Sequence, residues 1–214
     1  MKPSDVAEFY ADFDRHPGDR IRLFAAVRDF LPNASQVLYA GSYVDIAPSV
    51  WFDDVVYVDT DKRAARFFSE HRAVESLVAA KRLSVRGGAG TAAIDFHHLD
   101  YQTQLPIDDE SVDVVVSLYA GFVSEHCTRY LRVGGHLLVN PSHGDVAMAS
   151  LDDRYELVAV VNARDGKYRV SADKLDSYLV PKKPQTITVE RLHELGRGIA
   201  YTKSPFAYVF QRVR

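Results

Sequence analysis

The sequence has few of the features that mark several large classes of protein. Its 214 residues include a single cysteine, Cys127, which excludes a disulfide within this sequence and a cysteine-rich metal cluster. No run approaches the roughly 18 apolar residues of a membrane-spanning helix. The N-terminal segment contains Asp5, Glu8, Asp12 and Asp14 and lacks the apolar centre of a secretory signal. We therefore expect a cytoplasmic protein that does not enter a membrane.

The sequence also lacks a large excess of positive or negative charge. The 26 basic and 29 acidic residues give a net charge of −3, so no overall positive field exists to hold nucleic acid. The histidines lack metal-ligand spacing such as His-Glu-x-x-His, and we expect no metal site. Apolar residues make up 47% of the chain, which is ordinary for a folded globular protein. A small molecule is the expected substrate, and the oligomeric state is left open.

The order of apolar segments predicts the architecture. Two amphipathic helices are expected within the first 33 residues, and short apolar runs then alternate with helical segments. The runs are β-branched and continuous, which is typical of strands covered on both faces. The expected strands are 37–40, 55–58, 93–98, 112–118, 137–139, 156–161 and 207–210, with helices over 64–78, 123–131 and 189–195. Asp165–Gly166 is a turn signal that leads from 156–161 into 167–170, so the insertion is expected to be helical or a hairpin.

This alternation predicts an α/β fold, a doubly wound and mostly parallel seven-stranded sheet. N-terminal helices precede the sheet, and an insertion precedes the last strand. We expect one domain over residues 1–214: helices in 1–33, a nucleotide-binding core in 34–162, an insertion or lid in 163–205 and the last strand in 206–214. The stretch Gly87–Gly90 precedes a strand and lacks the Lys-Ser/Thr of a phosphate-binding loop, so it is expected to be an ordinary loop.

Carboxylates follow two of the expected strands, at the sheet edge where ligands bind in such folds. Asp59 can accept two hydrogen bonds from the vicinal diol of a ribose, and a solvated acid or helix cap is the alternative. Asp61 is expected to cap the following helix. Asp100 can accept from the amine of an adenine with Tyr101 beside the ring, and the alternative is an Asx turn.

Two segments resemble the class I methyltransferases that use S-adenosylmethionine. Residues 100–117, DYQTQLPIDDESVDVVVS, are similar to the family's pattern of an acid, a Leu-Pro pair and an Asp-Val-Val strand. Residues 131–139, LRVGGHLLV, resemble its Leu-Lys-Pro-Gly-Gly turn into the fifth strand. The resemblance covers about half the chain, from Val37 to Val139. It implies S-adenosylmethionine as cofactor and a last strand antiparallel to the fifth.

The family's first motif is altered here. It normally reads acid-x-Gly-x-Gly-x-Gly, whereas this chain has Tyr39 at the acid, Gly41 at the first glycine, Tyr43 at the second and Asp45 at the third. One interpretation is that Tyr43 and Asp45 supply different contacts, Asp45 taking the cofactor's α-amino group. The other is that the pocket has closed. The cofactor-binding residues that the resemblance implies are Gly41, Ser42, Tyr43, Asp45, Asp59, Thr60, Asp100, Tyr101 and Ser117.

The expected function is methyl transfer from S-adenosylmethionine to an unidentified small molecule. The alternative is a methyltransferase-like scaffold that lacks catalytic activity or that binds a different nucleoside or small ligand. The direction of the Tyr43 side chain discriminates between them. Whether the chain is an enzyme therefore stays open, and no catalytic residue is assigned, although His143 lies at the correct end of the sheet for a base.

Overall fold

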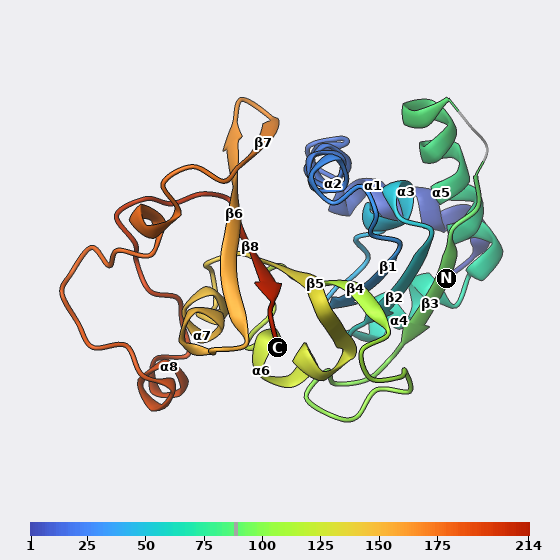
Figure 1. Ribbon diagram of the computed structural model, residues 1–214. Coiled ribbons are helices and arrows are strands. Elements are labelled where there is room, and N and C mark those ends of the chain that lie inside the picture. The colour runs from blue at the N-terminus through green and yellow to red at the C-terminus, as the bar shows by residue number, and fades with distance from the viewer. Residues whose placement is uncertain (88–89) are drawn as a thin grey trace. The chain divides into compact units, whose positions relative to one another are not determined.

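The computed structural model describes residues 1–87 and 90–214, so Gly88 and Ala89 of the glycine-rich stretch lie outside the described residues. The chain divides into two compact units, Met1–Asp100 and Tyr101–Arg214 (Figure 1). Each unit has its own strands and helices. The expectation of one domain over 1–214 stays a prediction.

The first unit is a parallel sheet with helices. Strands β1 (Gln36–Ala40), β2 (Asp54–Val58) and β3 (Ala93–His97) lie in the order β3-β2-β1. Val37 pairs with Val55, and Val55 pairs with Ile94. The helical elements are the 3-10 helix η1 (Pro3–Asp5), α1 (Val6–Phe13), α2 (Asp19–Phe30), α3 (Pro48–Trp51), α4 (Lys62–Phe68) and α5 (His71–Arg86). The predicted strands of this unit are confirmed.

The helix expected over 64–78 is two helices instead. Asp61 caps α4 by accepting from the backbone N–H of Arg63 at 2.7 Å, as predicted. The break at Ser69–Glu70 separates α4 from α5. At the end of α4, Phe68 stacks on Phe96 of β3, with ring centroids 4.5 Å apart and planes within 9°. This contact anchors the short helix on the sheet, which the periodicity of the sequence alone does not reveal.

The second unit combines parallel and antiparallel strands in the order β4-β5-β8-β6-β7. β4 (Val112–Ser117) and β5 (Leu131–Val139) are parallel, and β8 (Ala207–Arg212) runs antiparallel to β5, as predicted. β6 (Tyr155–Arg164) and β7 (Lys167–Ser171) form a hairpin. The helical elements are α6 (Val123–Cys127), η2 (Thr128–Tyr130), α7 (Asp145–Leu151), η3 (Leu175–Tyr178) and α8 (Val189–Leu195).

The predicted α/β class is confirmed, but the strand number is corrected. The described residues form eight strands, three in the first unit and five in the second, where seven were expected. The additional strand is β7. It arises because the turn at Asp165–Gly166 has both residues at positive φ, 51° and 69°, which matches the twist of a tight hairpin.

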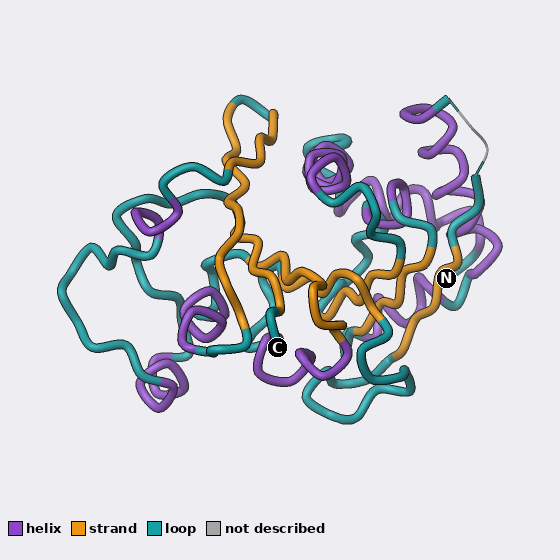
Figure 2. Tube along the Cα trace, in the orientation of Figure 1, coloured by secondary structure: helices purple, strands orange, loops and turns teal. Residues whose placement is uncertain are grey.

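The segment between β7 and β8 is mostly loop, with η3 and α8 as its only helical elements among the described residues (Figure 2). An antiparallel bridge between Pro181 and Tyr201 fastens its two halves. None of the described helices combines the length and the apolar character that crossing a membrane requires.

Candidate functional site

The loop after β1 has an unusual backbone. The N–H groups of Gly41 and Ser42 both donate to the carbonyl oxygen of Val58, at 2.8 and 3.3 Å, so the loop folds back over the end of β2. Gly41 has φ 68° and Tyr43 has φ 47°. Glycine adopts this left-handed region readily, whereas a tyrosine there costs about 1–2 kcal/mol. Tyr43 therefore has a backbone conformation that favours glycine.

Asp59 holds this loop through its carboxylate. Oδ2 accepts from the backbone N–H of Tyr43 at 2.7 Å, and Oδ1 accepts from that of Asp61 at 2.7 Å. The two bonds fix the orientation of a half-buried carboxylate at the end of β2. A carboxylate has about four acceptor positions, so roughly two remain for a ligand. Asp59 is thus pre-oriented and still able to accept from a diol.

The Tyr43 side chain turns toward α1. Its ring lies 6.3 Å from the ring of Phe9 and 5.9 Å from that of Phe13, and the Arg63 guanidinium lies 5.1 Å from its centroid. Partial burial raises the pKa of its hydroxyl. Aromatic pairs contribute about 0.5–1.5 kcal/mol each beyond area burial, so this packing offsets the backbone strain. The ring therefore has defined neighbours on α1 and α4.

Asp45 lies inside the first unit, with 1% of its surface exposed. Its carboxylate accepts from the Tyr39 hydroxyl at 3.2 Å and from the Ala47 N–H at 3.1 Å, and Arg20 Nε lies 3.6 Å away. Burial raises the pKa of this carboxyl to about 6, against the opposing effects of Arg20, Ala47 and Tyr39. The residues at the acid and third-glycine positions of the altered motif thus bond to each other.

The remaining predicted residues of this unit differ in exposure. Thr60 is exposed, and its carbonyl oxygen lies 2.9 Å from His98 Nε2. Ser42 is buried and its hydroxyl points to the Tyr43 carbonyl oxygen, 3.4 Å away. Asp100 is exposed and ends the first unit. The structure thus brings Gly41, Ser42, Tyr43 and Asp59 together directly, while Asp45 supports their loop from within.

Tyr101 and Ser117 belong to the second unit. The Tyr101 ring lies 6.1 Å from that of His126, and its hydroxyl occupies the space that a Cβ at Gly121 would need. Ser117 ends β4, is buried, and donates to Asp145 Oδ2 at 2.6 Å. Both side chains therefore have partners within their own unit, and their assignment to the cofactor stays a prediction.

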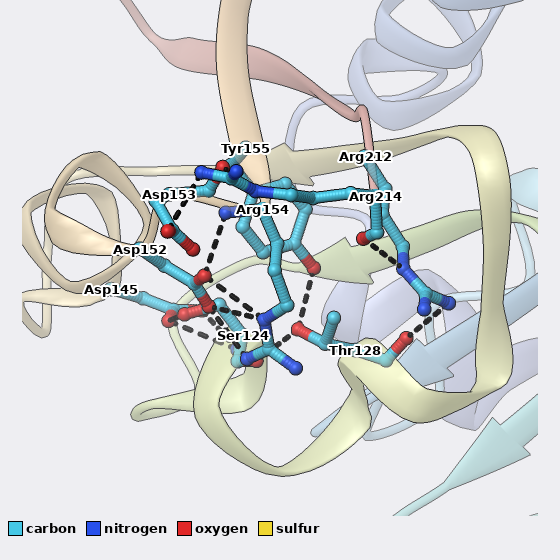
Figure 3. Close-up of polar contacts among 9 residues, drawn as sticks. All are labelled: Ser124, Thr128, Asp145, Asp152, Asp153, Arg154, Tyr155, Arg212 and Arg214. Atoms are coloured by element: carbon cyan, nitrogen blue, oxygen red, sulfur yellow. Dashed lines mark hydrogen bonds and ion pairs between the residues drawn. The ribbon is translucent and has the colours of Figure 1, made fainter.

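Asp145 is the centre of a buried polar cluster that the sequence did not indicate (Figure 3). Besides Ser117, it accepts from the backbone N–H of Ser124 at 3.0 Å and from the Ser124 hydroxyl. Thr128 and Tyr155 continue the cluster, with their hydroxyl oxygens 2.7 Å apart. Burial raises the pKa of Asp145 to about 6, although the hydrogen bonds from Ser117 and Ser124 favour the charged form.

This cluster predicts a pH-dependent stability. The Asp145 pKa is about 6 in the folded state, above the ordinary value of about 3.9 for an aspartate, so the native protein binds an extra proton between these values. The contribution of Asp145 to the free energy of unfolding should therefore rise as the pH falls from 7 toward 4, and it is lost as the pH rises through 6. This contribution should amount to about 3 kcal/mol, because a pKa difference of one corresponds to about 1.4 kcal/mol.

Urea unfolding at pH 4.5, 5.5, 6.5 and 7.5 measures this contribution. Asp145→Asn serves as the comparison, because its amide keeps the size and an acceptor oxygen without titrating. The wild type should gain stability over the variant as the pH falls. Asp45 titrates in both proteins and cancels. Parallel pH profiles for the two proteins would show that Asp145 does not titrate in this range.

A second group of linked hydrogen bonds lies in the loop after β5. Asn140 Oδ1 accepts from the backbone N–H of Tyr119 at 3.1 Å, which fixes the amide orientation. The Ser142 hydroxyl therefore donates to Asn140 Oδ1, at 2.8 Å, and has no second proton for His143 Nδ1, 2.7 Å away. His143 must donate from Nδ1, which leaves Nε2 as the nitrogen that can accept a proton.

Tyr119 shares the left-handed conformation of Tyr43, with φ 61° at the end of β4. Each unit therefore has a tyrosine in a costly conformation in the loop that follows a parallel strand. Strained residues gather at functional sites.

Among the described residues, no group of three or more His, Cys, Asp or Glu side chains could hold a metal ion.

Comparison with known proteins gives structural matches only. No family model and no curated protein matches the chain. The matching solved structures include a SAM-dependent methyltransferase from Thermotoga maritima, described as a possible histamine N-methyltransferase, at 14% identity and TM-score 0.49, covering 99% of this chain and 97% of that one. A SAM-dependent methyltransferase from Methanosarcina mazei matches at 13% identity and TM-score 0.45, covering 87% of this chain and 96% of that one.

The YcgJ protein from Bacillus subtilis matches at 19% identity and TM-score 0.37, and the match covers 55% of this chain and 49% of YcgJ. This chain therefore spans about half the length of that protein. Methyltransferases that use S-adenosylmethionine, which the sequence motifs resemble, are thus present among the structural matches. At such identities and TM-scores, none of the matches transfers an activity or a substrate to this chain.

Proposed function

We propose that this chain binds S-adenosylmethionine and transfers its methyl group to a small molecule. The observation that carries the proposal is Asp59, a carboxylate held by two backbone N–H groups at the end of β2, beside a loop with glycine-like geometry. This is the place and the chemistry with which an α/β sheet holds a ribose.

The residues present fit the cofactor. Asp59 would accept from the ribose hydroxyls, and Gly41, Ser42 and Tyr43 would face the amino-acid part through their backbone. Asp45 would hold the loop through Tyr39 and Ala47, since its carboxylate is enclosed. Thr60 and Asp100 of the same unit complete the proposed site, and the roles of Tyr101 and Ser117 stay predictions of the sequence. When bound, S-adenosylmethionine supplies an electrophilic methyl group on a sulfonium centre.

Methyl transfer needs little acid or base chemistry from the protein. The chain's own part is to position the reactants and to exclude water. An acceptor that must lose a proton needs a base as well. His143 stays the sequence's candidate for that base, and its Nε2 can accept a proton because Nδ1 is committed to Ser142.

Tyr43 favours a second candidate, a scaffold that holds a different nucleoside. Its side chain adds an aromatic ring that a glycine would not supply, and the Arg63 guanidinium lies over this ring. Calorimetry of the full chain with S-adenosylmethionine, S-adenosylhomocysteine, adenosine, ATP and NADH separates the candidates. Micromolar binding of the first two, and weaker binding of the others, supports methyl transfer. Preferential binding of another nucleoside supports the alternative.

A further inference from the structure

A cavity outside the proposed cofactor site lies wholly within the second unit. It has a volume of about 350 Å³ and lies between the loop after β5 and the segment that joins α8 to β8. Ser142 lines it from the first of these segments, while Arg197, Tyr201, Lys203 and Ser204 line it from the second and Tyr208 lines it from β8. None of these six residues belongs to the proposed cofactor site.

The charge of this cavity is opposite to that of the whole chain. Its described lining residues include two cations, Arg197 and Lys203, and no carboxylate, although the chain has a net charge of −3. The hydroxyls of Ser142 and Ser204 add neutral hydrogen-bonding groups. A cavity with two cations and two hydroxyls is chemically matched to an oxyanion.

Lys203 is held in place. Its ammonium donates to the Ser177 hydroxyl at 2.6 Å and lies 4.7 Å from the centroid of the Tyr178 ring. Tyr208 donates to the carbonyl oxygen of Tyr178 at 3.2 Å, which links the same segment to β8. An ammonium has three N–H donors, so about two remain after the bond to Ser177.

The cavity wall is also fastened by the backbone. Gly198 donates to the Ser142 carbonyl oxygen at 3.3 Å, and a Cβ at position 198 would overlap the Pro141 carbonyl oxygen. Lys182 donates to Ala200, and Thr202 donates to Val180, both at 2.8 Å. The segment between α8 and β8 therefore lies so close to the loop after β5 that only glycine fits at position 198. These contacts make the cavity part of the folded unit.

The rest of the lining suits an apolar body. Tyr201 and Ile199 are 3% and 6% exposed, and the rings of Tyr201 and Tyr208 lie 6.1 Å apart. Burial raises the pKa of Tyr201 to about 12, so this ring adds no negative charge near neutral pH. We propose that the cavity binds a small oxyanion with an apolar or aromatic body, independently of the cofactor site.

Four probes of similar size test the proposal in the absence of S-adenosylmethionine, so its outcome is separate from that of the proposed function. Phenyl phosphate and benzoate carry the oxyanion as phosphate and carboxylate. Benzyl alcohol is neutral and benzylamine is cationic. Calorimetry or amide chemical shifts of the full chain should show saturable binding of one or both anions, with the stronger of the two identifying the oxyanion, and much weaker binding of the other two.

Arg197→Gln and Lys203→Gln remove the two cations. Each should weaken binding of the preferred anion roughly tenfold or more, the equivalent of one charge-assisted hydrogen bond at about 1.4 kcal/mol per tenfold. Arg191→Gln is the matched control, because Arg191 lies on α8, pairs with Glu194 at 2.8 Å and does not line the cavity. It should leave binding unchanged.

Arg197 is exposed, so its variant is expected to fold, and the melting temperature verifies this. Absence of saturable binding of both anions at millimolar concentration would overturn the proposal. So would equal binding of benzyl alcohol, or an Arg191→Gln effect as large as that of Arg197→Gln.

Discussion

Replacement of Asp59 by alanine is expected to weaken S-adenosylmethionine binding roughly 100-fold or more. The estimate takes two hydrogen bonds to a charged acceptor at about 1.5 kcal/mol each, with 1.4 kcal/mol per tenfold. The variant also leaves the N–H groups of Tyr43 and Asp61 without their carboxylate. The loop after β1 therefore loses its support together with the ligand's acceptor.

Two companion variants separate these effects. Asp59→Asn keeps one acceptor oxygen and the size of the side chain, so its affinity should lie between those of wild type and Asp59→Ala. Asp29→Ala removes an exposed carboxylate from α2 and should leave affinity unchanged. Calorimetry gives the affinities, and the melting temperature identifies loss of folding. An Asp59→Ala protein that is folded and binds like wild type would remove Asp59 from the site.

Replacement of Asp45 by alanine should lower the free energy of unfolding by about 2–4 kcal/mol, because two buried donors lose their acceptor at about 1–3 kcal/mol each. Arg20 would lose the neighbouring carboxylate, and the Tyr39 hydroxyl and Ala47 N–H would lose their acceptor inside the first unit. Urea unfolding measures the change.

Tyr39→Phe is the matched comparison for Asp45→Ala. It removes one neutral donor to the same carboxylate and keeps the ring, so we expect a loss of about 1 kcal/mol. Asp45→Ala should be the more damaging change, because it takes the acceptor from the Tyr39 hydroxyl and the Ala47 N–H and the neighbouring carboxylate from Arg20, whereas Tyr39→Phe removes one donor. Equal losses for the two variants would show that Asp45 acts only as a packing residue.

The sequence predicts the parts of this site that depend on local pattern. The short apolar runs indicate β1, β2 and β4, and the strand ends then place Asp59 and Ser117 at the edges where ligands gather. The cap formed by Asp61 is also local, because the residue it bonds lies two positions further along the chain. Each of these features needs only neighbouring residues.

Most of the missed side-chain contacts depend on residues far apart in the chain. Asp45 is enclosed because Arg20 and Tyr39 approach it, and Asp145 is enclosed because Ser117 and Ser124 do. Periodicity contains no information on such contacts. The direction of the Tyr43 ring is of the same kind, since it is set by Phe9 and Phe13 on α1.

The amide signals of Tyr43 and Asp61 test the central claim most directly, because both N–H groups bond to the carboxylate proposed to hold the ribose. We would titrate ¹⁵N-labelled protein with S-adenosylhomocysteine and follow these two signals. The account predicts saturable shifts of both, absent in a folded Asp59→Ala protein. Saturable binding that leaves both signals unmoved would place the nucleoside elsewhere, and no binding at millimolar ligand would contradict a cofactor site at this loop.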